Sequence, residues 1–197
     1  MKNSTIIKSG FLMLIFMLIC VFFVSLAEKT TKAKIEINEQ ELLIKRLNEI
    51  VSNYDNPILD DKFYKTIDLH GIEQTITIFP AKTNNTVFAY LVEHTYPNGY
   101  NGNIRLLTGI NVDGSLLGVR VVNHKETPGL GDKIETRKSN WIKSFTGLSL
   151  KNTERSKWKV KRDGGIFDQF TGATITPRAI VSSAYQILDY FSNNEIK

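Results

Sequence analysis

The chain of 197 residues has few of the residue types that build metal centres. It contains one cysteine, Cys20, and three histidines. A disulfide framework, an iron–sulfur cluster and a cysteine-based zinc site each need several thiolates, so this chain alone can build none of them. Because no second histidine lies at ligand spacing from His124, the sequence predicts no metal site.

Strong charge of one sign is also lacking, with 25 basic against 20 acidic residues. This excess is too small and too scattered to indicate a nucleic-acid partner. The sequence has no Walker-type lysine loop and no nicotinamide fingerprint. Its 42% hydrophobic and 10% aromatic residues exclude a disordered chain and predict one folded domain of about 150 to 170 residues plus an appendage.

Residues 9–27 form a run of nineteen residues without a charge. As a helix this run would span roughly 28 Å, close to the ~30 Å hydrocarbon core of a bilayer. We expect a retained transmembrane anchor. A cleaved signal peptide is the alternative, because Lys2 and Lys8 form a basic start and small residues precede Glu28. The bulky Ile19 before Cys20 argues against lipoprotein processing.

The orientation of this anchor does not follow from a count of flanking charges. Lys2 and Lys8 precede the run, and three lysines, at positions 29, 32 and 34, follow it. A short N-terminal tail is easily retained in the cytoplasm, while a signal-like anchor directs the domain after it across the membrane. We therefore expect a single-pass protein of the bacterial inner membrane, with residues 1–8 in the cytoplasm and residues 28–197 on the periplasmic side.

Beyond the anchor, the pattern is first helical and then typical of strands. Residues 38–41 resemble a capping box that opens a helix, with an apolar face at Leu43, Leu47, Ile50 and Val51. Strands are expected at residues 75–79, 86–92, 104–110 and 116–122, which are rich in β-branched and aromatic side chains. Asp113-Gly114 predicts a hairpin, and residues 98–103 predict a second turn or loop. The expected fold class is α+β, with a mostly antiparallel sheet and flanking helices.

A first glycine-bearing segment directly follows the last of these strands. Proline and two glycines can hold an exposed backbone beside a flat ligand. A plain turn from strand to helix is the alternative, and His124 by itself is typical of a loop histidine. The candidate site residues of this segment are Glu126, Thr127, Pro128, Gly129, Leu130 and Gly131.

A second glycine-bearing segment precedes the last predicted helix. Thr176 is expected as the N-cap and Pro177 as the first helical residue, followed by an apolar stripe at Ile180, Ala184, Ile187, Leu188 and Phe191. Gly172 and Ala173 then lie just before a helix N-terminus, where backbone N–H groups and the helix dipole favour an anion such as phosphate. An ordinary capped helix start is the alternative.

The residues Asp168-x-x-Thr171-Gly172-Ala173-Thr174 resemble the flavinylation motif D-x-x-[ST]-G-A-T. With the upstream Glu126-Thr-Pro-Gly-Leu-Gly run, the single apolar span and the chain length, the sequence resembles the G subunit of the Rnf (Rsx) ion-translocating electron transport complex. The alternative within the same class is the flavin-carrying C subunit of the sodium-translocating NADH:quinone oxidoreductase, which has a similar plan but is typically longer.

This resemblance implies that an FAD-dependent FMN transferase attaches FMN, through its phosphate, to Thr174. Asp168, Thr171, Gly172 and Ala173 would form the recognition frame. Thr171 and Thr176 are the competing acceptors. Residues 126–131 would lie beside the isoalloxazine. Phe170 and Trp141 are candidate stacking partners, although aromatics near apolar runs are more often part of a core.

The domain organisation expected from these patterns has four parts: a tail at residues 1–8, an anchor at 9–27, a helical linker and the start of the exported domain at 28–73, and an FMN-binding domain at 74–197. By the resemblance, the protein relays electrons within a ferredoxin- and NAD-linked complex. It needs other membrane subunits, because one flavin and one span do not complete an electron path. The alternative from another class is an anchored binding module without a redox role.

Overall fold

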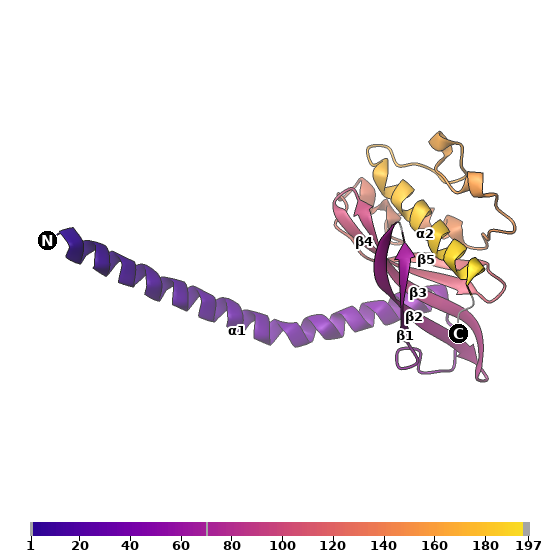
Figure 1. The fold of residues 1–197 in the computed structure, drawn as a ribbon. Coiled ribbons are helices and arrows are strands. Elements are labelled where there is room, and N and C mark those ends of the chain that lie inside the picture. Colours follow the sequence, from indigo (N-terminus) through magenta and orange to yellow (C-terminus); the bar gives the residue numbers. More distant parts are fainter. Residues whose placement is uncertain (1, 70, 195–197) are drawn as a thin grey trace. The chain divides into compact units, whose positions relative to one another are not determined.

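The computed structural model describes residues 2–69 and 71–194 of the chain (Figure 1). It divides into two compact units, Met1–Leu43 and Ile44–Lys197. The first unit consists of most of one helix, α1 (Lys2–Ile50), whose last turns belong to the second unit. The second unit holds a sheet and the helix α2 (Ile175–Asn193). The fold is therefore α+β with a preceding apolar helix, as predicted.

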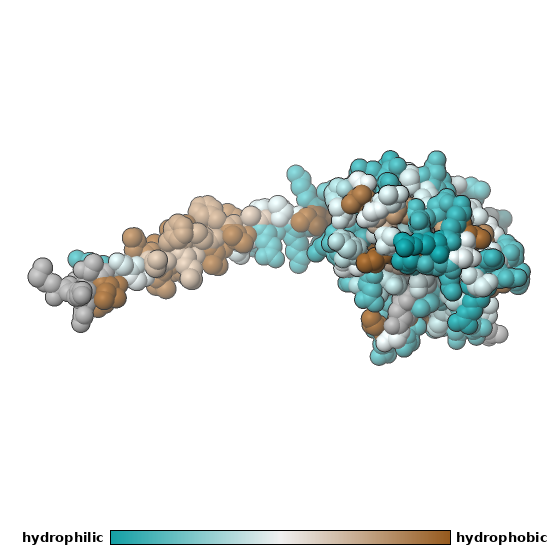
Figure 2. Space-filling model, turned by 90° about the horizontal axis from the view of Figure 1, so that it is seen from above, coloured by the Kyte–Doolittle hydropathy of each residue, from teal (hydrophilic) through white to brown (hydrophobic). Residues whose placement is uncertain are grey.

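The part of α1 in the first unit has the properties of a membrane anchor. Its side chains from Ile6 to Leu42 are exposed, including large apolar ones such as Phe11 and Phe22. Figure 2 shows the apolar part of this helix in brown and tan, and the polar part that follows it in teal and white. Among the described residues, α1 is the only helix long and apolar enough to cross a membrane. An exposed surface that is apolar all round is stable in lipid and unfavourable in water.

The capping box predicted at residues 38–41 is wrong, because α1 runs through this segment without a break. Inside a continuous helix the backbone N–H groups there already have partners four residues back, so no cap is needed. Glutamate, glutamine and leucine in this stretch also have good helix propensity. The apolar face after it is partly confirmed, since Leu47 and Val51 are buried.

The sheet of the second unit has five antiparallel strands in sequence order. The four predicted strands are confirmed within longer ones, and the edge strand β1 was not predicted. The turns at Asp113-Gly114 and before Gly102 are also confirmed. The bounds are β1 (Phe63–Leu69), β2 (Ile72–Thr83), β3 (Thr86–Gly99), β4 (Gly102–Asn111) and β5 (Leu116–Asn123).

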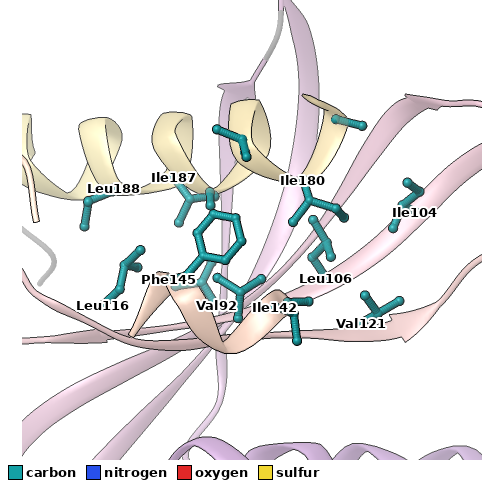
Figure 3. Close-up of a cluster of buried hydrophobic side chains, with 14 of the residues drawn as sticks. Val92, Ile104, Leu106, Leu116, Val121, Ile142, Phe145, Ile180, Ile187 and Leu188 are labelled. Carbon is teal, nitrogen blue, oxygen red and sulfur yellow. The ribbon is translucent and has the colours of Figure 1, made fainter. Parts of the chain in front are cut away.

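Helix α2 packs over the sheet with the predicted apolar stripe. Figure 3 shows Ile180, Ile187 and Leu188 pointing from α2 toward side chains of the sheet and toward Phe145. All three side chains are essentially inaccessible to solvent. This buried contact fixes α2, and therefore its N-terminus, relative to the ends of the strands.

The last turns of α1 are also packed within the second unit. A Cβ at Gly109 of β4 would lie 2.4 Å from Ile50 Cγ2, so glycine is needed for this close approach. Arg120 of β5 donates to the Glu49 carboxylate and to its main-chain oxygen, each at 3.0 Å. An apolar contact and a charged contact thus join the end of α1 to the sheet.

Helix α2 starts earlier than predicted. Its first residue is Ile175, and Thr174 holds the N-cap position. The prediction of Thr176 as N-cap is wrong, because Thr176 is a fully buried residue inside the first turn whose hydroxyl donates to a carboxylate. Pro177 is the third helical residue, where its missing N–H costs nothing because first-turn N–H groups have no intrahelical partner.

Candidate functional site

The structure brings the two glycine-bearing segments together. Glu126, in the loop after β5, accepts a hydrogen bond from the hydroxyl of Thr176 in the first turn of α2. These residues are 50 positions apart in the chain. A Cβ at Gly172 would lie 3.1 Å from Leu130 Cδ2, so the two segments also touch through Leu130. We therefore treat them as the two halves of one candidate site.

The first half, residues 126–131, is a turn with buried ends and an exposed tip. Glu126 and Gly131 are buried, and the residues from Pro128 to Leu130 are exposed. The main-chain oxygen of Thr127 accepts from the N–H groups of Leu130 and Gly131, at 3.2 and 3.0 Å. Gly129 has φ +78°, which favours glycine. The exposed tip presents backbone and the Leu130 side chain to solvent.

His124 supports this loop through hydrogen bonds on both ring nitrogens. Its Nδ1 accepts from the Glu126 N–H at 2.9 Å, so Nε2 carries the hydrogen and lies 3.1 Å from Glu135 Oε1. Burial opposes the charged form of Glu135, but hydrogen bonds from Arg137 and His124 outweigh it and lower the pKa of that carboxyl. Among the described residues, no group of three or more His, Cys, Asp or Glu side chains could hold a metal ion.

The second half, residues 168–174, is held by two aromatic side chains, Phe170 and Trp141. Phe170 is only 5% exposed and lies in the core, with its ring 4.9 Å from that of Trp141 in an edge-on arrangement. The indole N–H of Trp141 donates to the main-chain oxygen of Asp168 at 2.8 Å. Phe170 is therefore a core residue and not an exposed stacking partner, while Trp141 is half-buried.

The polar residues of the motif face solvent. The Asp168 side chain is 69% exposed and forms an ion pair with Lys161 at 2.6 Å. Thr171 and Gly172 are exposed, and Gly172 has φ +82°. Ala173 donates its N–H to the Phe170 oxygen at 3.3 Å, which closes a turn before the helix. The motif is thus an exposed turn above one buried ring.

Thr174 lies at the N-cap of α2 with a half-exposed side chain. Its hydroxyl forms no hydrogen bond with any other described residue. The first-turn N–H groups of a helix and its dipole favour a negative charge at this end. Thr171 is also exposed, whereas the hydroxyl of Thr176 is buried and donates to Glu126. Thr174 therefore combines accessibility with a helix N-terminus.

Sequence reasoning missed a cation in the first turn of α2. Arg178 donates to both carboxylate oxygens of Asp163, at 2.6 and 2.8 Å. This hydrogen-bonded pairing lowers the pKa of the Asp163 carboxyl and raises that of the Arg178 guanidinium. No local sequence pattern predicts a pair 15 residues apart. The pair ties the segment before the motif to the helix after it.

Comparison with known proteins identifies the class of domain first. The FMN-binding domain family matches residues 99–189, a range that contains both halves of the candidate site. A second family, the RnfG N-terminal region, matches residues 1–50, which are the residues up to the end of α1. The chain thus combines an N-terminal region of this kind with an FMN-binding domain.

Full-length relatives then identify the particular family. The chain is 43% identical to the G subunit of the ion-translocating oxidoreductase complex of Shewanella baltica (strain OS223), over 99% of this chain and 93% of that protein. It is 40% identical to the corresponding G subunit of Vibrio atlanticus (strain LGP32), over 97% and 92% respectively. The chain therefore belongs to the family of G subunits of ion-translocating oxidoreductase complexes.

The residues of the site fit an FMN group attached by its phosphate. A phosphoester needs a hydroxyl without a competing hydrogen bond, and the partly exposed Thr174 offers one at a helix N-terminus. A flat aromatic ring needs apolar surface nearby. Leu130, beside Gly172, is 40% exposed, and Ile175, next to Thr174, is 45% exposed. A hydroxyl for the phosphate and apolar side chains for the ring thus lie in the same part of the site.

Proposed function

We propose that this protein is a membrane-anchored subunit of an ion-translocating oxidoreductase complex that carries FMN covalently on Thr174. The observation that carries the proposal is the hydroxyl of the partly buried Thr174, which has no hydrogen-bond partner among the described residues and lies at the N-terminus of α2. The match to the FMN-binding domain family supports the choice of cofactor. When bound, FMN supplies a group that takes up and releases electrons.

The attachment is a transfer from FAD by an FAD-dependent FMN transferase. The Thr174 oxygen forms a new bond to the FMN phosphorus as the pyrophosphate bond of FAD breaks, AMP leaves, and the hydroxyl proton is released. A threonine hydroxyl is a poor nucleophile without an activating base or metal, so a dedicated enzyme fits better than self-reaction. In the product, the helix N-terminus stabilises the remaining negative charge of the phosphodiester.

The protein's own residues then have distinct tasks. Thr174 retains the cofactor, so that it is not lost into an open aqueous compartment. Leu130 and the exposed turn at Pro128 and Gly129 provide the surface beside the ring. Asp168 and Thr171 belong to the frame that the transferase recognises. Because the linkage leaves the ring chemically unchanged, contacts with the ring set its potential. Other membrane subunits complete the electron path.

The decisive experiment is Thr174→Ala in cells that contain the transferase. The wild-type chain should keep flavin fluorescence on a denaturing gel and gain the mass of one FMN phosphoester, and the variant should show neither. Thr86→Ala is the matched control and should keep its flavin, because Thr86 is an exposed threonine at the start of β3, outside the motif. A flavin band that persists in Thr174→Ala would contradict the assignment. A wild-type chain without any flavin absorbance would favour the non-redox binding module.

The proposed topology places residues 9–27 across the inner membrane, residues 1–8 in the cytoplasm and the FMN-binding domain in the periplasm. The fully exposed apolar stretch of α1 supports a lipid partner for this segment. A reporter fused after Lys197 should be active only if it requires export. Activity of a cytoplasmic reporter at the same position would reverse the orientation, and a mature N-terminus at Glu28 would replace the anchor by a cleaved signal.

A further inference from the structure

Glu126 is a buried carboxylate at the meeting point of three segments. It is 4% exposed. Its Oε1 accepts from the N–H of Asn101, in the turn between β3 and β4, at 3.1 Å. Its Oε2 accepts from the hydroxyl of Thr176 in α2. One side chain therefore connects a strand turn, the loop after β5 and the start of the helix.

Two glycines provide the space for this carboxylate. A Cβ at Gly99 would lie 2.8 Å from Glu126 Oε1. A Cβ at Gly131 would lie 3.0 Å from both Glu126 Cβ and Thr176 Oγ1. These distances are shorter than ordinary van der Waals contacts, so any larger residue would push the carboxylate or the hydroxyl away. The backbone on both sides is thus shaped around the contact between Glu126 and Thr176.

The chemistry of the contact requires a carboxylate and not merely a polar side chain. Both partners of Glu126 are donors, one N–H and one O–H, and an ionised carboxylate accepts with both oxygens. A glutamine in its place has one accepting oxygen, so its NH₂ group would face one of the two donors. Among the described residues, no Lys, Arg or His lies within ion-pair distance of Glu126.

The contact fixes the spacing between the two halves of the site. The loop that Glu126 begins carries Leu130, which packs against Gly172. Thr176, which donates to Glu126, is two residues after Thr174 in the first turn of α2. Because helical backbone has a fixed geometry, holding Thr176 also holds the backbone of Thr174 close to the loop. A shift of about 1 Å in such an arrangement is enough to spoil an oriented reaction.

We propose that Glu126 is a positioning residue, which acts through the hydroxyl of Thr176 to hold the loop at residues 127–131 in register with the flavin attachment residue. This proposal rests on the proposed function, because it takes Thr174 as the attachment site. It assigns to Glu126 a role different from direct contact with the cofactor, which the sequence resemblance implies for the whole loop.

The test is Glu126→Gln in the full-length chain, produced with the transferase. The expected result is a folded protein with severalfold slower flavin attachment, and with lower fluorescence anisotropy and weaker visible circular dichroism of the flavin that is attached. The matched control is Glu93→Gln. Glu93 of β3 is also a buried carboxylate, but it pairs with Arg105 of β4 and with neither the loop nor α2. The control should attach and order flavin as the wild type does.

Thr176→Val removes the same hydrogen bond from the other side with little change in volume. If the two residues act as one unit, the double variant with Glu126→Gln is no worse than the more affected single variant. Additive losses would overturn the proposal, as would wild-type attachment and flavin signals in Glu126→Gln. If Glu126→Gln does not fold, Thr176→Val carries the test with the same readouts. A wild-type chain without FMN on Thr174 would instead contradict the proposed function.

Discussion

The two halves of the candidate site are held in opposite ways. The loop at residues 126–131 is fixed by polar contacts at its buried ends, through Glu126 and the main-chain hydrogen bonds to Thr127. The motif at residues 168–174 is fixed by an apolar contact at its middle, through the buried ring of Phe170, while the residues on both sides of that ring face solvent.

This difference suits two different tasks. Hydrogen bonds are directional, so they set the geometry of the loop beside the ring. Apolar burial is not directional, and it can hold a turn in place while leaving its backbone and hydroxyls open. A threonine that a separate enzyme must modify has to remain reachable. The loop at residues 126–131 is therefore held in a defined geometry, and the motif at residues 168–174 remains accessible to the modifying enzyme.

The largest expected effect comes from removing the apolar anchor of the motif. Phe170→Ala should destabilise the domain by about 3–5 kcal/mol, because it deletes a buried ring and leaves a cavity. Urea unfolding of the full chain in detergent measures this loss. Tyr64→Ala is the control, since Tyr64 is 63% exposed on the edge strand β1 and should change stability by about 0.5 kcal/mol or less. A loss below about 1 kcal/mol for Phe170→Ala would contradict the comparison.

A smaller effect is expected where the two halves touch. Gly172→Ala places a Cβ on a residue with φ +82° and 3.1 Å from Leu130 Cδ2. Gly147→Ala is the matched control, because Gly147 has φ +83° with no atom within 4 Å of the added Cβ. Both should lose about 1–2 kcal/mol from the backbone conformation. Only Gly172→Ala should also slow flavin attachment, and equal attachment in both variants would exclude a role for the Leu130 contact.

The loop at residues 126–131, with the neighbouring Asp132, should contribute less to the stability of the domain at low pH. The backbone N–H of Gly129 lowers the pKa of Asp132 below its ordinary value of 3.8, against the effect of burial and with help from Lys138. A lowered folded-state pKa adds stability that is present above pH 3.8 and is lost as the pH falls through the folded value. Asp132→Asn should therefore be less stable than the wild type at neutral pH, and this difference in stability should shrink as the pH falls below 3.8. An equal difference at neutral and at low pH would contradict this account.

The sequence predicted most of the fold because the relevant patterns are local. Strands β2 to β5 follow from β-branched runs separated by turn residues, and α2 follows from an apolar stripe of helical period. The edge strand β1 escaped prediction because its exposed face mixes Tyr64 with polar residues. The break expected near residue 38 failed because a capping pattern also occurs inside helices, where tertiary context decides.

The sequence predicted the two segments of the candidate site but not the contacts between them. The two segments stand out through glycine, proline and the motif around Thr174. The contact of Glu126 with Thr176 could not be predicted, because it spans 50 residues and depends on how α2 packs over the sheet. The pairing of Arg178 with Asp163 is hidden for the same reason. The sequence therefore predicted Thr176 as the helix cap, whereas its hydroxyl donates a hydrogen bond to Glu126.

The smallest expected effect on stability concerns the exposed acid of the motif. Asp168 and Lys161 form an ion pair in which both side chains are mostly exposed, at 69% and 62%. Such surface pairs contribute about 0–1 kcal/mol, so Asp168→Asn should leave the urea unfolding curve nearly unchanged. Flavin attachment should nevertheless fall severalfold, because we propose that the transferase recognises this carboxylate.

Lys161→Met is the matched control, because it breaks the same ion pair and leaves the carboxylate of Asp168 in place. In-gel flavin fluorescence per amount of protein compares the two variants. Attachment that falls only in Asp168→Asn shows that the carboxylate itself is read. An equal fall in both variants would mean that the ion pair orients the turn. The motif at residues 168–174 would then depend on a polar contact, as the loop at residues 126–131 does. Normal attachment in both would remove Asp168 from the recognition frame.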